Sequence, residues 1–478
     1  MFASTLPLLP LVLDDVPWAL RQMLVQEGLP HIERDRRSAL GRFLLFDSRN
    51  GPLRRPRAGQ IAIDVELLRA PFDEDPFSQW SDHRPQRFAW QVGPLRPAEE
   101  IARVDKRALR RGVMARLQEE LERRGGVWIG LAPYPLPYRS AFNWRIDYDA
   151  FDERDFARLQ AVLSAREDAV SHFVNGSAYQ GRLAWVRRLA GQDVGSHGYW
   201  HHTYRTYEEN LRNIERGIQV LEEAGLRPAG FTAPGGRFNR SLLKALERLE
   251  VGHSSEFALA YDELPLFPAG SSVLQIPVHP VCLGIVLEAA RSDQRRQAAE
   301  AAREYFAELV HARIDSGEPV FLYGHPTGRL GRYPHVVEGV FREIDGRGDV
   351  WPVTMSVWAE WWRARRHIQL RVVRDGEGYA VELVHKPVRH GLAIEYRRGA
   401  RVARLPLEAA KLRFSPAAVE YRKQEPAAAV RPLRVDSRHG LRGRVRRWVD
   451  WERETPVEEI APTTLRNVAK RTLRTLWK

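Results

Sequence analysis

From Phe142 onward, short apolar runs alternate with longer stretches of helical periodicity. The apolar runs that we read as strands are Ala169–Val174, Gly230–Thr232, Val273–Val278, Pro319–Tyr323 and Trp351–Met355. The helical stretches between and after them include Tyr204–Ala224, Arg240–Leu249, Arg295–Asp315 and Trp358–Arg366. Strands that alternate with helices favour stacked β-α units. We therefore predict an α/β fold with barrel-like closure, in which reactive groups gather at the C-terminal ends of the strands.

Ile146 and the residues before it indicate a further strand, and two carboxylates stand at its C-terminal end. Asp147 and Asp149 are two residues apart, so both project from the same face of an extended segment. His197 and His201 are four apart, and if this segment begins a helical turn, both imidazoles can bind one cation. One carboxylate and two histidines leave coordination positions open, which suits a catalytic metal. The second carboxylate is then available as a base.

Two later stretches strengthen this interpretation: A-P-G-G-R-F-N (Ala233–Asn239) and L-Y-G-H-P (Leu322–Pro326). In this order, the four motifs resemble those of the polysaccharide deacetylase family, the NodB-homology type of carbohydrate esterase. The resemblance spans about Phe142 to Arg366. It implies a distorted (β/α) barrel that removes N-acetyl groups from a carbohydrate with a divalent metal ion, most often Zn²⁺.

The resemblance also assigns roles to individual residues. It makes Asp147 the general base and His325 the general acid, and it makes Asp149, His197 and His201 the metal ligands. The residues that it places against the substrate are Tyr199, Trp200, Pro234, Gly235, Gly236, Arg237 and Tyr323. A backbone N–H near Tyr199 would hold the oxyanion, and the glycines would let the loop approach a sugar closely. The aromatic rings fit sugar stacking or the protein core.

The chain departs from the family pattern at two points. Tyr148 separates the two aspartates, which are adjacent in many members. Thr232 stands where the family usually has the arginine that orients the base, so Arg145 or Arg237 would have to replace it. If neither does, the alternative is a degenerate protein that binds glycans without turnover. A related metal-dependent amide or ester hydrolase is the other alternative. We place Ser254–Phe257, with Tyr261 and Asp262, at the rim of the pocket.

The residues before the deacetylase-like region (142–366) mix helical and strand patterns. We predict an N-terminal α/β domain over residues 1–131 and a Pro-rich linker over 132–141. The expected helices are Val16–Gly28 and Lys106–Arg124, and the expected strands are Arg42–Asp47, Gln60–Val65 and Gly126–Leu131. Substrate binding, docking and oligomerisation remain open as its role.

After the catalytic region, the pattern changes to strict alternation. Residues 367–430 are predicted to form a small antiparallel β domain, with strands at Ile368–Val373, Tyr379–Val384, Leu392–Tyr396 and Val402–Leu407. Carbohydrate binding and a cap on the catalytic domain both fit it. Residues 431–478 form a basic tail that ends in an amphipathic helix, with Leu465, Val468 and Leu476 toward one side. Contact with anionic lipid and docking on the protein itself both fit this helix.

Charge and cysteine content limit the partners and the compartment. The formal net charge is +13, but only seven of the 74 basic residues are Lys, and residues 431–478 hold 13 basic against six acidic residues. A nucleic-acid partner would rest on charge alone, and we do not expect one. Cys282 is the single cysteine, so no internal disulfide can form, which fits a reducing compartment. The first residues lack the basic start of a secretory signal, and no stretch suits a membrane span. We expect a cytoplasmic protein, with peripheral contact to the inner face of the membrane through the basic C-terminal helix as a further option.

Overall fold

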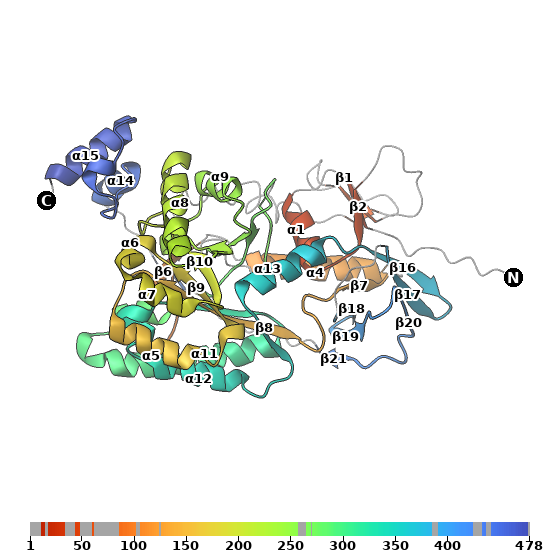
Figure 1. Ribbon diagram of the computed structural model, residues 1–478. Coiled ribbons are helices and arrows are strands. Elements are labelled where there is room, and N and C mark those ends of the chain that lie inside the picture. Colours follow the sequence, from red (N-terminus) through yellow and green to blue (C-terminus); the bar gives the residue numbers. More distant parts are fainter. Residues whose placement is uncertain are drawn as a thin grey trace.

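The computed structural model describes twelve segments of the chain (Figure 1): residues 11–14, 18–33, 44–47, 60–61, 86–101, 106–123, 126–256, 264–268, 270–384, 391–423, 433–435 and 441–476. The deacetylase-like region is therefore described almost throughout. Tyr261, Asp262 and residues 62–65 of the expected strand Gln60–Val65 lie outside the described residues. Among the described helices, none combines the length and apolar character that crossing a bilayer requires.

A parallel sheet of eight strands forms the centre of the molecule. Its order is β13-β12-β11-β10-β9-β8-β14, and β15 pairs with the first residues of β8. The strands are β8 (Ser140–Tyr148), β9 (Val170–Val174), β10 (Asp193–Ser196), β11 (Gly230–Phe231), β12 (His253–Ser254), β13 (Leu274–Gln275), β14 (Val320–Gly324) and β15 (Val350–Pro352). Every residue of β8, β9 and β14 is buried, as expected for parallel strands covered on both faces. The predicted distorted (β/α) barrel is confirmed, in the form of a half-barrel.

Helices connect these strands and cover the sheet. They are α5 (Glu153–Leu163), α8 (Tyr207–Glu223), α9 (Arg240–Arg248), α10 (Leu283–Ala289), α11 (Arg295–Asp315), α12 (Pro334–Ile344) and α13 (Met355–Arg366). Figure 1 shows α5, α11 and α12 along one side of the sheet and α8 and α9 along another. The helix expected from Tyr204 begins later, because Thr206 is its N-cap: the Thr206 hydroxyl accepts from the Glu209 N–H and donates to the Glu209 carboxylate.

The segments on either side of the half-barrel share sheets with each other. β7 (Trp128–Leu131) pairs antiparallel with β18 (Ala393–Arg398), and β22 (Leu433–Val435) pairs with β5 (Gln86–Ala89). The antiparallel strands β16 (Leu370–Asp375), β17 (Gly378–Leu383), β18 and β19 (Arg401–Pro406) lie close to the ranges expected from sequence. The boundaries placed at residues 131 and 367 therefore do not separate independent sheets. In these sheets, strands from distant parts of the chain are hydrogen-bonded to each other.

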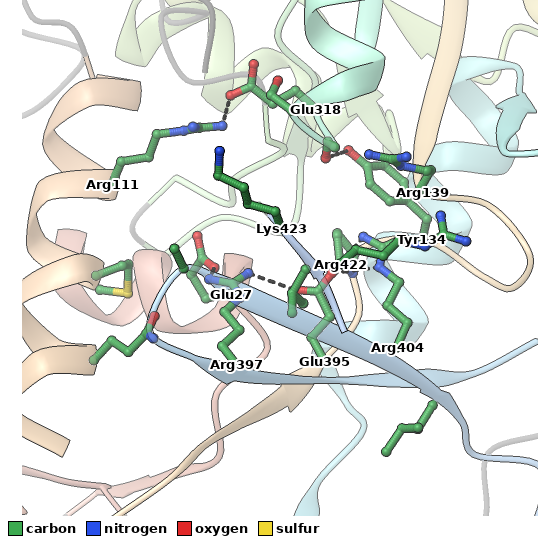
Figure 2. A pocket seen from close by; sticks show the side chains of 18 of the residues that line it. Glu27, Arg111, Tyr134, Arg139, Glu318, Glu395, Arg397, Arg404, Arg422 and Lys423 are labelled. Atoms are coloured by element: carbon green, nitrogen blue, oxygen red, sulfur yellow. Dashed lines mark hydrogen bonds and ion pairs between the residues drawn. The ribbon is translucent and has the colours of Figure 1, made fainter. Parts of the chain in front are cut away.

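Buried ion pairs hold these flanking segments together (Figure 2). Glu395 of β18 accepts from Arg397 at 2.7 Å and from Arg404 at 2.6 Å. Glu27, at the end of α1 (Trp18–Gln26), pairs with Arg397 at 2.9 Å and with Arg110 of α4 (Lys106–Arg123) at 2.5 Å. Burial raises the pKa of Glu395, but the two arginines outweigh it and lower that pKa to about 2. Glu27 thus joins α1 to guanidinium groups of α4 and β18, whereas Glu395 pairs with arginines of β18 and β19.

A cavity of about 600 Å³ lies beside these ion pairs. Glu318, just before β14, contacts Arg107 and Arg111 of α4 at its edge, and Arg139, just before β8, also lines it. The cavity therefore lies at the N-terminal ends of β8 and β14. It is at the opposite end of these strands from Asp147 and His325.

Candidate active site

Strand register brings the reactive side chains to one edge of the sheet. Ile146 pairs with Gly324, so Asp147 at the end of β8 and His325 after β14 leave the sheet side by side. Ser196 of β10 pairs with Val174 of β9, which in turn pairs with Tyr148. His197 therefore emerges at the same edge. The expectation that the site lies at the C-terminal ends of the strands agrees with this geometry.

Asp149, His197 and His201 meet around one point. The Asp149 Oδ1 atom lies 3.2 Å from His197 Nε2 and 3.2 Å from His201 Nε2, and one ligand atom from each residue lies within 4.8 Å of the others. Burial raises the pKa of Asp149, but His325, His197 and His201 outweigh it and hold that pKa well below its usual range. Two imidazole nitrogens and an ionised carboxylate oxygen fit a divalent cation such as Zn²⁺.

Thr232 orients the first of these histidines. His197 Nδ1 lies 2.9 Å from the Thr232 carbonyl oxygen and 2.7 Å from its Oγ1. An Nδ1–H that donates to the carbonyl leaves the Nε2 lone pair facing Asp149, which is the tautomer that a metal needs. From sequence, Thr232 was noted only as a missing arginine. Its place at the end of β11, next to the end of β10, is the signal that could have revealed this contact.

The segment that carries His201 is a loop, so the expected helical turn from His197 to His201 is wrong. Gly198 has a φ of 71°, and a Cβ at this position would lie 2.8 Å from the Asn213 side-chain nitrogen. Asn213 of α8 accepts from the Tyr199 N–H at 3.0 Å and from the Trp200 N–H at 2.6 Å. These two N–H groups are thus engaged by the protein and do not face a substrate.

Arg145 contacts the expected base directly. Its Nη2 donates to Asp147 Oδ2 at 2.7 Å, and its Nη1 donates to the Ser255 carbonyl oxygen at 2.6 Å. The Asp147 and Arg145 side chains are both almost fully buried, and the guanidinium lies 4.9 Å from the centre of the Tyr323 ring. Of the two arginines offered as replacements, Arg145 holds the aspartate, whereas Arg237 is exposed on its loop. Asp147 Oδ1 has no partner within the described part of the chain.

Glu256 is a buried acid that the sequence placed only at the pocket rim. Its Oε1 accepts from the Ser254 hydroxyl at 2.5 Å and from the Ala233 N–H at 3.1 Å, while its Oε2 has no partner among the described residues. Burial raises the pKa of Glu256 to about 8, with Asp147 adding to the rise and Arg145 opposing it. At neutral pH, Glu256 is therefore mostly protonated.

His325 completes the cluster from β14. Its Nε2 lies 3.3 Å from Asp149 Oδ2, and its Nδ1 is buried with no partner within the described residues. Burial lowers the pKa of His325 to about 4, against the opposing pull of Asp149. The imidazole is therefore neutral at rest.

The residues expected to contact substrate fall into two groups. The Tyr199 and Trp200 rings are buried and pack with Tyr204 and Val220, and Arg216 stacks on both rings. The loop after β11 instead reaches the surface: its members are Pro234 and Gly236, which are buried, and Gly235 and Arg237, which are exposed. Tyr323 is buried, and the Arg145 guanidinium lies over its ring. The loop, more than the aromatic rings, is thus open to a ligand.

Comparison with known proteins supports this assignment for the central region. Residues 144–253 match the family model described as polysaccharide deacetylase. The match includes Asp147, Asp149, His197 and His201, and the resemblance inferred from the four motifs is confirmed. Residues 144–253 are thus similar to polysaccharide deacetylases of the NodB-homology type.

Several solved structures are similar to part of the chain. A putative polysaccharide deacetylase from Mycobacterium smegmatis is 22% identical, with a TM-score of 0.42, over 51% of this chain and 96% of that chain. A probable polysaccharide deacetylase from Pseudomonas aeruginosa PAO1 is 17% identical, with a TM-score of 0.41, over 49% and 95%. A CE4-family pseudoenzyme from Bacillus anthracis is 13% identical, with a TM-score of 0.32, over 45% and 64%. No curated protein matches the chain. These likenesses are too distant to support an argument about activity.

Proposed function

We propose that the protein is a metal-dependent hydrolase that removes N-acetyl groups from a carbohydrate. The observation that carries the proposal is the convergence of Asp149, His197 and His201 on one point, beside a buried aspartate with one unpartnered oxygen. Zn²⁺ is the ion that we propose for this donor set. When bound, such an ion polarises the acetyl carbonyl and lowers the pKa of a water molecule.

Each residue around that point has a role in amide hydrolysis. Asp147 Oδ1 is the atom that would accept the proton of the attacking water, while Arg145 donates to Oδ2 and fixes the orientation of the carboxylate. His325 would give a proton to the departing amine, which leaves poorly unless it is protonated. Because the pKa of His325 is about 4, the imidazole is neutral at rest, and the proton that balances the reaction would be the one that Asp147 takes from the attacking water.

Binding of glycans without turnover is the second candidate. It rests on Thr232, which stands where the family usually has the arginine that orients the base. The contact between Arg145 and Asp147 supplies the missing cation from β8 itself, two residues before the base. This contact supports turnover over binding alone.

The partner that we propose is an N-acetylated polysaccharide or glycan intermediate, handled at the inner face of a membrane. The loop at Gly235 and Arg237 is the part of the site that is open to such a ligand. Buried Cys282, the single cysteine, is consistent with a reducing compartment.

An assay of acetate release tests the proposal. The purified chain is analysed for bound metal and then incubated with N-acetylglucosamine oligosaccharides and added divalent ions. We expect acetate release that Asp147→Ala lowers by about 10²–10⁴-fold while the bound metal is retained. Asp149→Asn is expected to lose the metal, and exposed Asp168→Ala serves as the matched control. Glycan binding with no release under any divalent ion would instead establish the second candidate.

A further inference from the structure

Among the described residues, most of the large exposed apolar side chains lie in the C-terminal helices. Eight large apolar side chains are exposed, and five of them lie between residues 441 and 476. We call these five the terminal apolar surface: Leu441 and Trp448 of α14 (Leu441–Trp448), and Leu465, Val468 and Leu476 of α15 (Leu465–Leu476). Leu465 is 86% exposed, Leu441 78% and Leu476 75%. On α15, the spacing of Leu465, Val468 and Leu476 places them on one side of the helix, and exposed apolar side chains that share a face mark an interaction site.

Helix α15 is docked with its polar face inward. Lys470 is buried and pairs with buried Glu452 at 2.7 Å, and Asn467 is buried and donates to the Ala461 carbonyl oxygen at 2.9 Å. Arg474 reaches the Thr455 carbonyl oxygen at 2.6 Å. An ordinary surface helix buries its apolar stripe and exposes its charges. The opposite orientation of α15 leaves its apolar side available to something else.

Helix α14 adds positive charge next to its exposed apolar residues. Arg442, Arg444 and Arg446 are exposed on α14, and none of the three pairs with a carboxylate in the part of the chain that the structure describes. A second copy of the chain would bring the same arginines together, and this repulsion disfavours self-association. An anionic bilayer instead accepts leucine and tryptophan at its interface and attracts arginine to its headgroups.

We infer that the terminal apolar surface, with the exposed arginines of α14, docks the protein on an anionic lipid bilayer. This inference deepens the proposed function, because it rests on a glycan substrate presented at a membrane. Residues 441–476, which carry this surface, contact the loop that holds His201. Asp450 lies 3.2 Å from Nε2 of His202, the residue after His201, and accepts from the Arg205 N–H at 3.1 Å. Figure 1 shows α14 and α15 at the end of the molecule near α8.

Vesicle sedimentation with the full chain tests the inference. Vesicles of phosphatidylcholine alone are compared with vesicles that also contain phosphatidylglycerol. We expect binding to the anionic vesicles only, weakened by salt. The triple variant Leu465→Ser, Val468→Ser, Leu476→Ser should lower this binding on the order of tenfold or more. Charge reversal at Arg442, Arg444 and Arg446 should do the same.

The control variant is Val357→Ser with Val384→Ser, which changes two other exposed apolar residues, each about as exposed as Val468. It should bind vesicles as the unaltered chain does. The inference is overturned by absent binding, by equal binding to neutral vesicles, by unchanged binding of the triple variant, or by a dimer that the triple variant dissociates. Acetate release from a water-soluble oligosaccharide is measured in parallel and should not change in the triple variant. Vesicle binding without acetate release would reject the proposed activity but leave the docking surface standing.

Discussion

Replacing Glu256 with glutamine should stabilise the protein. The gain in the free energy of unfolding, relative to the unaltered chain, should grow as the pH rises. Glu256 is fully buried, and its pKa is raised from the ordinary 4.5 to about 8. A carboxyl group with a raised pKa in the folded state keeps its proton between these two values, whereas the unfolded chain releases it. The folded state is therefore penalised progressively from about pH 4.5 to pH 8. Glutamine is neutral at every pH and avoids this penalty.

The size of the effect follows from the pKa values. Each pKa unit is worth about 1.4 kcal/mol of differential stability, so a rise from 4.5 to about 8 corresponds to roughly 5 kcal/mol. Near pH 5, the variant and the unaltered chain should differ little. Near pH 8, the free energy of unfolding of Glu256→Gln should be higher by several kcal/mol, and above this pH the difference should level off.

Urea unfolding from pH 5 to 9, followed by fluorescence, measures this difference. A chelator is present throughout, so that metal release does not contribute. Glu395→Gln is the matched control: it is another buried glutamate, but the pKa of Glu395 is about 2, so its stability difference should stay constant over this range. A difference for Glu256→Gln that is flat with pH, or that falls, would refute the view that Glu256 is protonated in the folded protein.

Three further changes test the site and its support. Arg145→Ala should lower acetate release on the order of 100-fold without loss of bound metal, because Asp147 loses the cation that holds Oδ2; Arg227→Ala, an exposed arginine, is the control. Thr232→Val keeps the carbonyl acceptor of His197 but removes Oγ1, so metal affinity in a chelator competition should fall by about tenfold or less, against a larger loss for His197→Ala. Glu395→Gln should lower the free energy of unfolding by about 3 kcal/mol at pH 7, because the half-buried Arg404 loses its carboxylate and Arg397 keeps only that of Glu27. In the unaltered chain, the contribution of Glu395 is fully present above about pH 4.5 and is lost as the pH falls toward about 2. Unchanged unfolding of Glu395→Gln would show that these ion pairs do not hold the flanking segments.

Local sequence patterns were sufficient to predict the helices and strands of the half-barrel. The periodicity of Arg295–Asp315 predicted α11 with the bounds that the structure has, and the strands around Asp147 and His325 fell close to their expected positions. The four motifs place chemistry at strand ends, and parallel strands bring these ends together. The class of fold was therefore accessible from sequence, and so was the grouping of Asp149, His197 and His201.

Contacts between distant residues decided the rest. The loop that carries His201 is held by Asn213 from α8, so its spacing alone suggested a helical turn that does not form. Arg145 and Arg237 were equivalent candidates until the packing on Ser255 oriented Arg145 toward Asp147.

In the flanking segments too, the sequence pattern predicted the elements, whereas contacts with distant residues decided their orientation and pairing. The amphipathic pattern of Thr463–Lys478 predicted a helix, but which side of α15 faces the protein depended on buried Glu452, which pairs with Lys470. Likewise, β7 pairs with β18 more than 260 residues later in the chain, across the two boundaries that composition suggested. Sequence periodicity reports the conformation of neighbouring residues, whereas pairing, orientation and protonation depend on groups that only folding brings together.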